Sequence, residues 1–245
     1  MKYIVTGSSN GIGRCIALRF LKEGHEVWGI DIDDRITAFK DYLEKFHFYK
    51  ADIAYKEELD GFLESVKGVK FDGIINNAGI NRGGLENCSY EDFGYVISIG
   101  LSAPFYLVKS LKESLNPNAG IVNIASTRAA MSEKNRESYA AAKGGIVALT
   151  HAMSISLRGK ARVNCISPGW IDTADYCDRP KYEASHADIM QHPVERIGRP
   201  EDIAEMVLYL CSEKGSFIDG QDIVIDGGMS KQMIWHGDNN WIYDV

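Results

Sequence analysis

Thr6-Gly7-Ser8-Ser9-Asn10-Gly11-Ile12-Gly13 is the stretch that decides the fold of this chain. It follows a β-branched, apolar run at Lys2–Thr6 and leads into an amphipathic segment at about Gly11–Glu23, so it predicts a strand, a glycine turn and a helix. Glycines in such a turn let the backbone approach a pyrophosphate, which the N–H groups of the helix N-terminus would face. By itself the turn leaves two interpretations open, a dinucleotide-binding loop or an ordinary glycine-rich turn.

Asp31 favours the dinucleotide interpretation. It ends the second predicted strand, 18 positions after Gly13, where a carboxylate can accept hydrogen bonds from the adenosine ribose hydroxyls and would repel a 2′-phosphate. NAD is therefore expected rather than NADP. The alternative is that Asp31 is one of several acidic residues marking a solvated turn, and Arg35 nearby could reverse the preference for NAD.

Strand and helix patterns alternate along the chain. Short β-branched and apolar runs, typical of buried strands, occur at Lys2–Thr6, Glu26–Asp31, His47–Ala51, Gly73–Asn76, Gly120–Ile124, Arg162–Ser167 and Asp222–Ile225. Amphipathic segments lie between them at about Gly11–Glu23, Lys56–Lys67, Tyr90–Leu115, Arg136–Arg158 and Pro200–Leu210. The alternation predicts an α/β fold: a single-domain, doubly wound (Rossmann-type) parallel sheet of about seven strands with helices on both faces.

Two segments stand apart from this alternation. We expect residues 1–245 to form one domain in which segment 170–196, mixed in character and following a Pro-Gly pair, is a lid over the substrate. The C-terminal tail, 229–245, carries Trp235, Trp241 and Tyr243. Because such side chains bury large apolar areas, we expect the tail to dock on a neighbouring subunit.

The composition excludes several classes of protein. The 245 residues are 45% apolar and 25% charged, enough for one large core, and the net charge is −7 without any run of Lys and Arg. A nucleic-acid binder is therefore not expected, nor a protein of anionic membrane surfaces. The five cysteines are scattered and never form a CxxC, which argues against a disulfide framework or a metal site and fits a reducing cytoplasm. Neither an export signal nor a membrane span is expected, so a cytoplasmic protein with a small-molecule partner is predicted.

Three further residues suggest a chemical step. Tyr139 and Lys143 are four apart in a helical segment, so their side chains lie on one face. A lysine ammonium at about 4 Å would favour the phenolate form of Tyr139, as an acid/base group requires, although a plain surface pair is the alternative. Ser126 follows the strand Gly120–Ile124 at the carboxyl edge where such sheets bind ligands, and its hydroxyl could hold a substrate oxygen or cap a turn.

Taken together, the motifs resemble those of the short-chain dehydrogenase/reductase family. They are Thr6-Gly-x-x-x-Gly11-x-Gly13, Asn76-Asn77-Ala78-Gly79, Ser126, Tyr139-x-x-x-Lys143, Pro168-Gly169 and Asp226-Gly227-Gly228. Their order and spacing match, including 13 positions from Ser126 to Tyr139, and the likeness covers about Met1 to Met229. The glycines resemble those of the single-domain branch. The resemblance implies hydride transfer between NAD(H) and an alcohol or carbonyl carbon of a small metabolite of polyol, hydroxy-acid or sterol type.

The resemblance also implies roles for individual residues. Tyr139 would exchange a proton with the substrate oxygen, Lys143 would assist it and bind the nicotinamide ribose, and Ser126 would orient the substrate. Asp52 and Ile53 would meet the adenine, Thr173 the carboxamide, and Asn164 would be mainly structural. The expected cofactor-binding residues are Gly7, Ser9, Asn10, Gly11, Ile12, Gly13, Asp31, Ile32, Asp52, Ile53, Asn77, Ala78, Gly79, Tyr139, Lys143, Pro168, Gly169, Ile171 and Thr173. A homotetramer or dimer, formed through the helices at Tyr90–Leu115 and Arg136–Arg158, is likewise implied.

One position departs from the family pattern. Gly100, in Val96-Ile-Ser-Ile-Gly100-Leu101, stands where the family carries a catalytic Asn that helps to hold a proton-relay water. We expect activity to survive this change. Two other functions remain open: an NADPH-dependent ketoreductase such as a 3-oxoacyl-carrier reductase, and a non-catalytic dinucleotide sensor. Arg128, His186 and His192 could reach a substrate or could be ordinary surface and loop residues.

Overall fold

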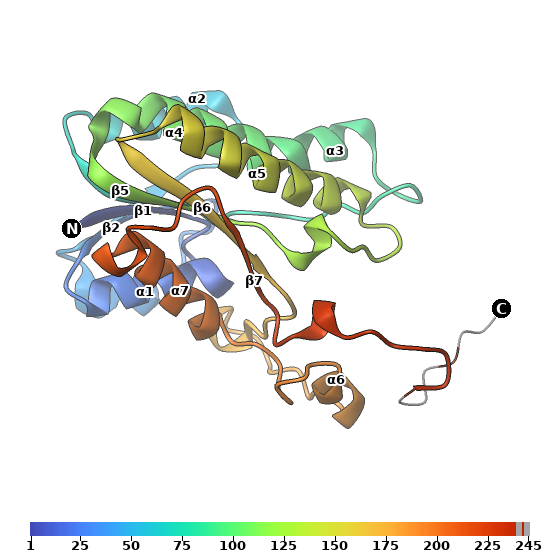
Figure 1. Ribbon diagram of the computed structural model, residues 1–245. Helices are drawn as coiled ribbons and strands as arrows, with labels where there is room; N and C mark the ends of the chain where they lie inside the picture. Colours follow the sequence, from blue (N-terminus) through green and yellow to red (C-terminus); the bar gives the residue numbers. More distant parts are fainter. Residues whose placement is uncertain (239–241, 243–245) are drawn as a thin grey trace.

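A seven-stranded parallel sheet forms the centre of the protein (Figure 1). The computed structural model describes residues 1–238 and 242. The strands are β1 Lys2–Thr6, β2 Glu26–Asp31, β3 Phe46–Lys50, β4 Phe71–Asn76, β5 Leu115–Ile124, β6 Ala161–Pro168 and β7 Asp222–Ile225. Their order is β3-β2-β1-β4-β5-β6-β7, with every neighbouring pair parallel. The predicted doubly wound fold and the number of strands are confirmed.

Helices cover both faces of the sheet. In Figure 1 one layer contains α2, α3, α4 and α5, and the opposite layer contains α1 and α7. The helices are α1 Gly11–Lys22, α2 Lys56–Ser65, α3 Tyr90–Ile97, α4 Ala103–Leu111, α5 Glu137–Ser156, α6 His186–Met190 and α7 Pro200–Cys211. The strand order runs in one direction from β1 to β3 and in the other direction from β1 to β7. Because each crossover between parallel strands is right-handed, this reversal places helices on both sides of the sheet.

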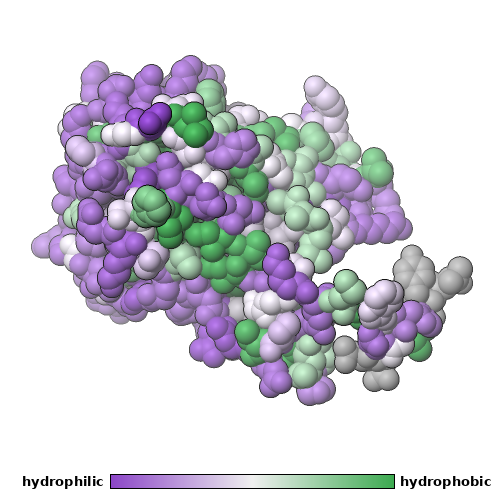
Figure 2. Space-filling view, in the orientation of Figure 1, coloured by the Kyte–Doolittle hydropathy of each residue, from purple (hydrophilic) through white to green (hydrophobic). Residues whose placement is uncertain are grey.

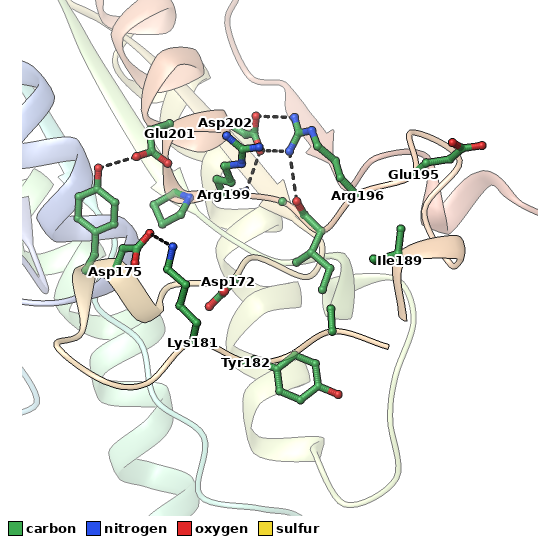
Figure 3. A pocket seen from close by; sticks show the side chains of 15 residues that line it. Asp172, Asp175, Lys181, Tyr182, Ile189, Glu195, Arg196, Arg199, Glu201 and Asp202 are labelled. Atoms are coloured by element: carbon green, nitrogen blue, oxygen red, sulfur yellow. Dashed lines mark hydrogen bonds and ion pairs between the residues drawn. The ribbon is translucent and has the colours of Figure 1, made fainter. Parts of the chain in front are cut away.

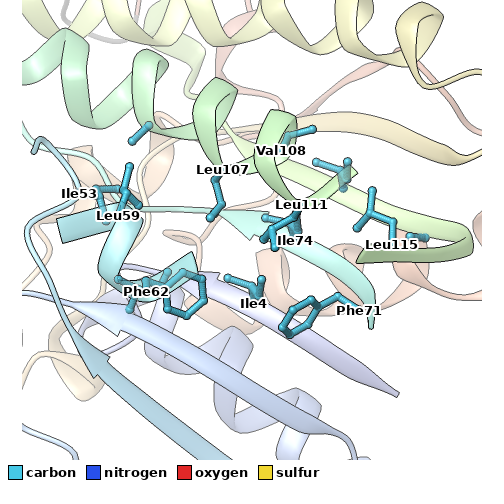
Figure 4. Close-up of a cluster of buried hydrophobic side chains, with 14 of the residues drawn as sticks. Ile4, Ile53, Leu59, Phe62, Phe71, Ile74, Leu107, Val108, Leu111 and Leu115 are labelled. Carbon is cyan, nitrogen blue, oxygen red and sulfur yellow. The ribbon is translucent and has the colours of Figure 1, made fainter. Parts of the chain in front are cut away.

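Apolar side chains fill the space between the sheet and each helical layer. On the side of α2 and α4, Ile4 and Ile74 of the sheet pack against Leu107 and Leu111 of α4 and Phe62 of α2 (Figure 4). A second cluster joins the other face of the sheet to α1 and α7, and includes Val5, Ile75, Phe20, Ile203 and Val207. With both faces covered, the central strands are buried along most of their length, which explains their largely apolar runs.

Three elements differ from the expected ones. The single helix expected at Tyr90–Leu115 is divided into α3 and α4 by a π-helical turn, η2, at Ser98–Ser102, and Leu115 already belongs to β5. A short 3₁₀ helix, Thr37–Tyr42, follows β2 and was not expected. Segment 170–196 contains α6, whose first turn is closed by a capping box between Ser185 and Asp188.

The helical stretch from α3 to the end of the 3₁₀ turn η3, Lys112–Ser114, is unusually apolar. Among the described residues, Tyr90–Ser114 is the one stretch whose length and mean hydropathy of 1.2 would allow it to cross a membrane. In the fold, 44% of its most apolar part is buried, and α4 packs through Leu107 and Leu111 onto the sheet.

The C-terminal tail leaves the body after β7 and a short 3₁₀ turn, η7, at Met229–Lys231 (Figure 1). Trp235 is 68% exposed and starts a turn in which its N–H donates to Asp238. Trp241 and Tyr243 of the predicted aromatic tail lie outside the described residues.

Candidate active site

The glycine turn lies between β1 and α1, at the point where the strand order reverses. Gly7 and Gly11 adopt φ values of +67° and +54°, which favour glycine. A Cβ on Gly7 would lie 2.8 Å from Nδ2 of Asn77, and one on Gly13 would collide with the carbonyl oxygen of Gly7. These two glycines therefore allow the turn to pack against the chain after β4. Gly11 instead faces the open cleft, where a Cβ would lie 3.5 Å from Thr173.

Helix α1 offers its N-terminus to this cleft. The side chain of its N-cap residue, Asn10, makes no capping hydrogen bond with the described residues. The first turn of the helix contains no acidic residue. Its first N–H groups and the positive end of the helix dipole are thus available to an anion such as a pyrophosphate.

Asp31 lies beside the turn, as predicted. Its Oδ2 accepts a hydrogen bond from the N–H of Ser9 at 2.9 Å, and its Oδ1 accepts one from the N–H of Asp33 at 3.0 Å. Arg35 is paired with Asp33 through Nε, at 2.8 and 3.0 Å, and also donates to Asn10 at 3.2 Å. The Arg35 guanidinium holds the pKa of the Asp33 carboxyl well below its usual range. Asp33 therefore neutralises Arg35, the arginine expected to favour a 2′-phosphate.

A pocket of about 360 Å³ runs from Asp31 along the carboxyl ends of β1, β2 and β4. Its apolar wall includes Ile32 and Ile53, and Asp52 fixes that end by accepting a bond from the Tyr95 hydroxyl at 2.8 Å. Burial, together with the bond to Asp52, raises the pKa of Tyr95 to about 12. The pocket has the size and the mixed lining expected for an adenosine.

The predicted catalytic residues meet in a second cavity of about 200 Å³. Ser126, Tyr139 and Lys143 all line it. The buried Lys143 donates from Nζ to the carbonyl oxygen of Ile124 at 2.6 Å, and this Nζ lies 5.4 Å from the centre of the Tyr139 ring. The spacing of four along α5 therefore places the ammonium beside the phenol, as the sequence predicted.

The two cavities form one continuous cleft, because they share several lining residues. Such a cleft could hold the two halves of a dinucleotide. Ile12, Asn77, Gly79 and Thr173 belong to both. Every predicted cofactor residue lines one or other cavity except Ser9 and Gly13. Ser9 is buried, with its hydroxyl donating to the carbonyl of Asp33, and Gly13 is needed for packing, so these two residues support the turn from beneath.

Ser126 caps a turn, which is one of its two expected roles, and it lies where the other role would require it. Its Oγ accepts a hydrogen bond from the N–H of Arg128 at 3.2 Å and caps the 3₁₀ turn η4, Thr127–Ala129. Ser126 and Tyr139 also line a third, wider pocket of about 510 Å³. The lining residues of that pocket are Ser126, Thr127, Arg128, Met131, Ser132, Glu133, Tyr139, Gly169, Trp170, Ile171, Gln191 and Met229. This third pocket is the candidate substrate site.

The other residues predicted to reach a substrate lie in different environments. Arg128 lines the substrate pocket and is paired with Glu133. His186 is exposed at the start of α6 and is not among the lining residues. His192 is buried, its Nδ1 lies 3.1 Å from the carbonyl of Asp188, and among the described residues its Nε2 has no hydrogen-bond partner. Asn164 holds the chain before β7 through Ile218 and Gln221, which is the structural role expected of it.

Arg14 was missed by sequence reasoning. It is buried beneath the glycine turn, where its Nε donates to the carbonyl of Ser9 at 2.6 Å. Both of its terminal nitrogens donate to Asp178, at 2.9 and 3.1 Å. Asp178 belongs to segment 170–196, which was predicted to be a lid, so this pair ties the glycine turn to that segment. An arginine in the first turns of a helix carries no motif that would have predicted such a contact.

A larger cavity, of about 700 Å³, is lined by residues of segment 170–196 and by the start of α7 (Figure 3). Ser126, Tyr139 and Lys143 are not among its lining residues. Its charged side chains are mostly paired with one another, as in Lys181 with Asp175 and Arg196 with Asp202. Asp172 lines this cavity, whereas its neighbours Ile171 and Thr173 line the catalytic one. The segment from Ile171 to Thr173 thus forms a wall between the two spaces.

Comparison with known proteins agrees with this geometry. A family model described as enoyl-(acyl carrier protein) reductase matches residues 7–230. A short-chain dehydrogenase family protein from Francisella tularensis has the same fold, with a TM-score of 0.84 and 32% identity, over 94% of this chain and 99% of that one. The chain belongs to the short-chain dehydrogenase/reductase family.

Two further members of this family are similar along almost their whole lengths. The structure of an apo SCOR enzyme from Clostridium thermocellum has a TM-score of 0.90 and 42% identity, covering 99% of this chain and 98% of that one. The 3-oxoacyl-[acyl-carrier-protein] reductase of Chlamydia pneumoniae is 34% identical over 243 residues, 94% of this chain and 96% of its own.

Gly100, where this short-chain dehydrogenase/reductase departs from the pattern, lies in the π-helical turn η2. It is buried against α5, and a Cβ there would lie 2.9 Å from Cβ of Ala142, the residue before Lys143. A side chain at position 100 would therefore meet α5 directly. The absence of a side chain lets η2 and α5 approach each other closely beside Lys143.

Proposed function

We propose that this protein is an NAD-dependent oxidoreductase that interconverts an alcohol and a carbonyl group on a small metabolite. The observation that carries the proposal is the meeting of Ser126, Tyr139 and Lys143 in one cavity between the dinucleotide cleft and the substrate pocket. A protein that only bound a dinucleotide would have no need of these three groups together at the inner end of the cleft.

The residues divide the proton chemistry between them. When bound, the nicotinamide supplies the acceptor or donor of the hydride. The substrate oxygen lies between the hydroxyls of Ser126 and Tyr139, and Tyr139 takes the alcohol proton in oxidation or returns one to the carbonyl oxygen in reduction. Lys143, held by the carbonyl oxygen of Ile124, places its ammonium group beside the phenol ring from which the proton moves. Ser126 donates to the oxygen while negative charge develops on it.

The adenosine end of the cleft favours NAD over NADP. Asp31 and Asp33 place two carboxylates there. Arg35, which lies beside them, is already paired with Asp33. A 2′-phosphate would meet this negative charge, whereas ribose hydroxyls can donate to it. Fluorescence titration with NADH and NADPH tests the preference, and tighter binding of NADPH would contradict it.

A 3-oxoacyl-carrier reductase is the second candidate, because the Chlamydia pneumoniae relative has that activity by name. It would use the same three catalytic groups with the opposite preferred direction. Reduction of a 3-oxoacyl thioester that is faster with NADPH than the best alcohol oxidation with NAD would favour this candidate.

Replacing Tyr139 by Phe tests the chemistry against the alternative of a non-catalytic sensor. The variant keeps the ring and loses the hydroxyl, so turnover should fall at least about 100-fold while NADH affinity changes little. Wild-type protein that binds NADH but turns over no alcohol or carbonyl in a broad panel would instead support a sensor.

We also propose that the protein is a cytoplasmic homotetramer or dimer. Two exposed apolar regions support assembly. One lies on α4 and α5, where Phe105 is 48% exposed beside a shallow groove containing Leu101 and Leu149. The other is visible near the middle of the face in Figure 2, over the region of α7 and β7. Val224 of β7 is 39% exposed, and Phe217, in the segment before β7, is fully exposed. Light scattering of the purified protein measures the number of subunits.

A further inference from the structure

The substrate pocket contains an ion pair that the proton chemistry does not use. Arg128 and Glu133 both line the pocket beside Ser126 and Tyr139, and their side chains are bonded to each other. Of the described residues that line the pocket, these two are the charged ones. A charged pair in this position should affect which substrates the pocket accepts.

Arg128 is fixed close to the reaction centre. Its N–H donates to Oγ of Ser126, and it is the middle residue of η4, so its backbone position is tied to the hydroxyl that orients the substrate. The side chain extends from there into the pocket and is 36% exposed. A guanidinium presents a planar pair of donors that matches a carboxylate. A carboxylate does occupy Arg128 in this structure, but it belongs to Glu133.

Glu133 can leave Arg128 at little cost. Its side chain is 56% exposed, and it lies in the irregular segment between η4 and α5. A second cation, Nε of Arg136, lies 3.6 Å from its other oxygen, so Glu133 keeps a positive partner when the first is taken. An exposed ion pair of this kind opposes a competing ligand by no more than about fivefold in affinity.

We propose that Arg128 is the carboxylate-recognising residue of the substrate pocket and that Glu133 occupies it until the substrate arrives. The substrates are then hydroxy acids and the corresponding oxo acids. In this arrangement the hydroxyl lies at Ser126 and Tyr139, the aliphatic part packs on Trp170 and Met229, and the carboxylate replaces that of Glu133. The inference rests on the proposed oxidoreductase activity and narrows its substrate class.

The alternative substrate classes would interact differently with the pair. A neutral polyol would place hydroxyls against both members, so Glu133 would contribute an acceptor and its loss would weaken binding. A sterol or long acyl chain would cover both charges with apolar surface, which is unfavourable for an ion pair that leaves water. The effect of removing the Glu133 charge therefore has opposite signs for an acid and a polyol.

The experiment compares short 2-, 3- and 4-hydroxy acids with their methyl esters, and with polyols, in NAD reduction. Wild type should prefer an acid to its ester. Arg128→Gln should lower kcat/KM for that acid about 10- to 100-fold and leave the ester nearly unchanged, because it removes hydrogen bonds to a charged group. Arg128→Lys should recover part of the loss, since it restores the charge without the planar fork. Glu133→Gln should raise kcat/KM for the acid by up to about fivefold.

A neighbouring ion pair provides the controls. Glu86 and Lys134 are 2.8 Å apart, exposed, and not among the residues that line the pocket. Glu86→Gln and Lys134→Gln make the same changes of net charge and should leave the ratio of acid to ester unchanged. An unchanged thermal midpoint in each variant shows that folding is intact.

Two kinds of failure are distinguishable. If wild type oxidises or reduces nothing in the panel, the proposed oxidoreductase function fails. If it turns over substrates but prefers esters or polyols, or if Glu133→Gln slows the acid, the function stands and the carboxylate assignment is overturned.

Discussion

Gly100 allows a direct test of how closely η2 packs against α5. It is buried in η2, and a Cβ placed on it would lie 2.9 Å from Cβ of Ala142 on α5. Both backbones are held by packing, so neither position can move aside freely. We predict that Gly100→Ala and Ala142→Gly are strongly coupled, and that Gly100→Asn destabilises the protein instead of restoring a missing group.

The size of the effect follows from two opposing terms. Overpacking at Gly100→Ala costs about 1–3 kcal/mol, and the better helix propensity of Ala returns about 1 kcal/mol. The single variant should therefore lose about 0–2 kcal/mol of unfolding free energy. Ala142→Gly removes the facing methyl and should lose about 1 kcal/mol of propensity. In the double variant the collision is absent and the two propensity terms cancel, so its stability should be close to that of wild type.

The double-mutant cycle isolates the contact between positions 100 and 142. The helix propensity of each substitution is the same in the single and the double variants, so it cancels from the coupling energy. The expected coupling is about 1–3 kcal/mol, measured by urea unfolding of the four proteins at one protein concentration. A coupling below about 0.5 kcal/mol would refute the close approach of η2 and α5. NAD turnover of the same four proteins should follow their stability, since Ala142 precedes Lys143.

The remaining predictions concern the cofactor, the lid and the tail. Asp31→Asn should weaken NADH binding about 10-fold or more and NADPH binding less, because it removes an ionised acceptor; equal losses in fluorescence titration would contradict the role of Asp31. The bond from Arg196 lowers the pKa of Asp202. Its contribution to the stability of the fold is therefore complete above the ordinary pKa of 3.8 and is lost as pH falls through the lowered pKa. Asp202→Asn should therefore cost up to about 1 kcal/mol at pH 7, with the difference from wild type shrinking below about pH 4 in urea titrations; a constant difference would count against this. Truncation after Met229 should reduce subunit number or thermal stability, and no change in light scattering and calorimetry would remove the support for a docking tail.

The sequence predicted those parts of the structure that depend on local patterns. The glycine turn, Asp31 and the spacing of Tyr139 and Lys143 each follow from one strand or one helix, whose geometry is nearly fixed once it forms. The carboxyl edge of the sheet then brings Ser126 to them, because parallel strands end on the same side.

The parts that sequence reasoning missed depend on contacts between distant segments. The π-helical turn at Ser98–Ser102 reflects how closely η2 packs against α5, which no local pattern reports. The pairing of Arg14 with Asp178 spans 164 positions. By contrast, α6 could have been found, since Ser185 and Asp188 have the spacing of a capping box.

The contact of Arg14 with Asp178 has a consequence for how strongly the glycine turn attracts an anion. One guanidinium holds the carbonyl of Ser9 beneath the turn and the carboxylate of Asp178 in segment 170–196. While Asp178 is in place, its negative charge offsets that of the guanidinium, and separation of Asp178 leaves the positive charge beneath the turn uncompensated. Movement of segment 170–196 away from Arg14 should therefore strengthen the attraction of the turn for a pyrophosphate, so that the position of the segment sets the affinity for a dinucleotide.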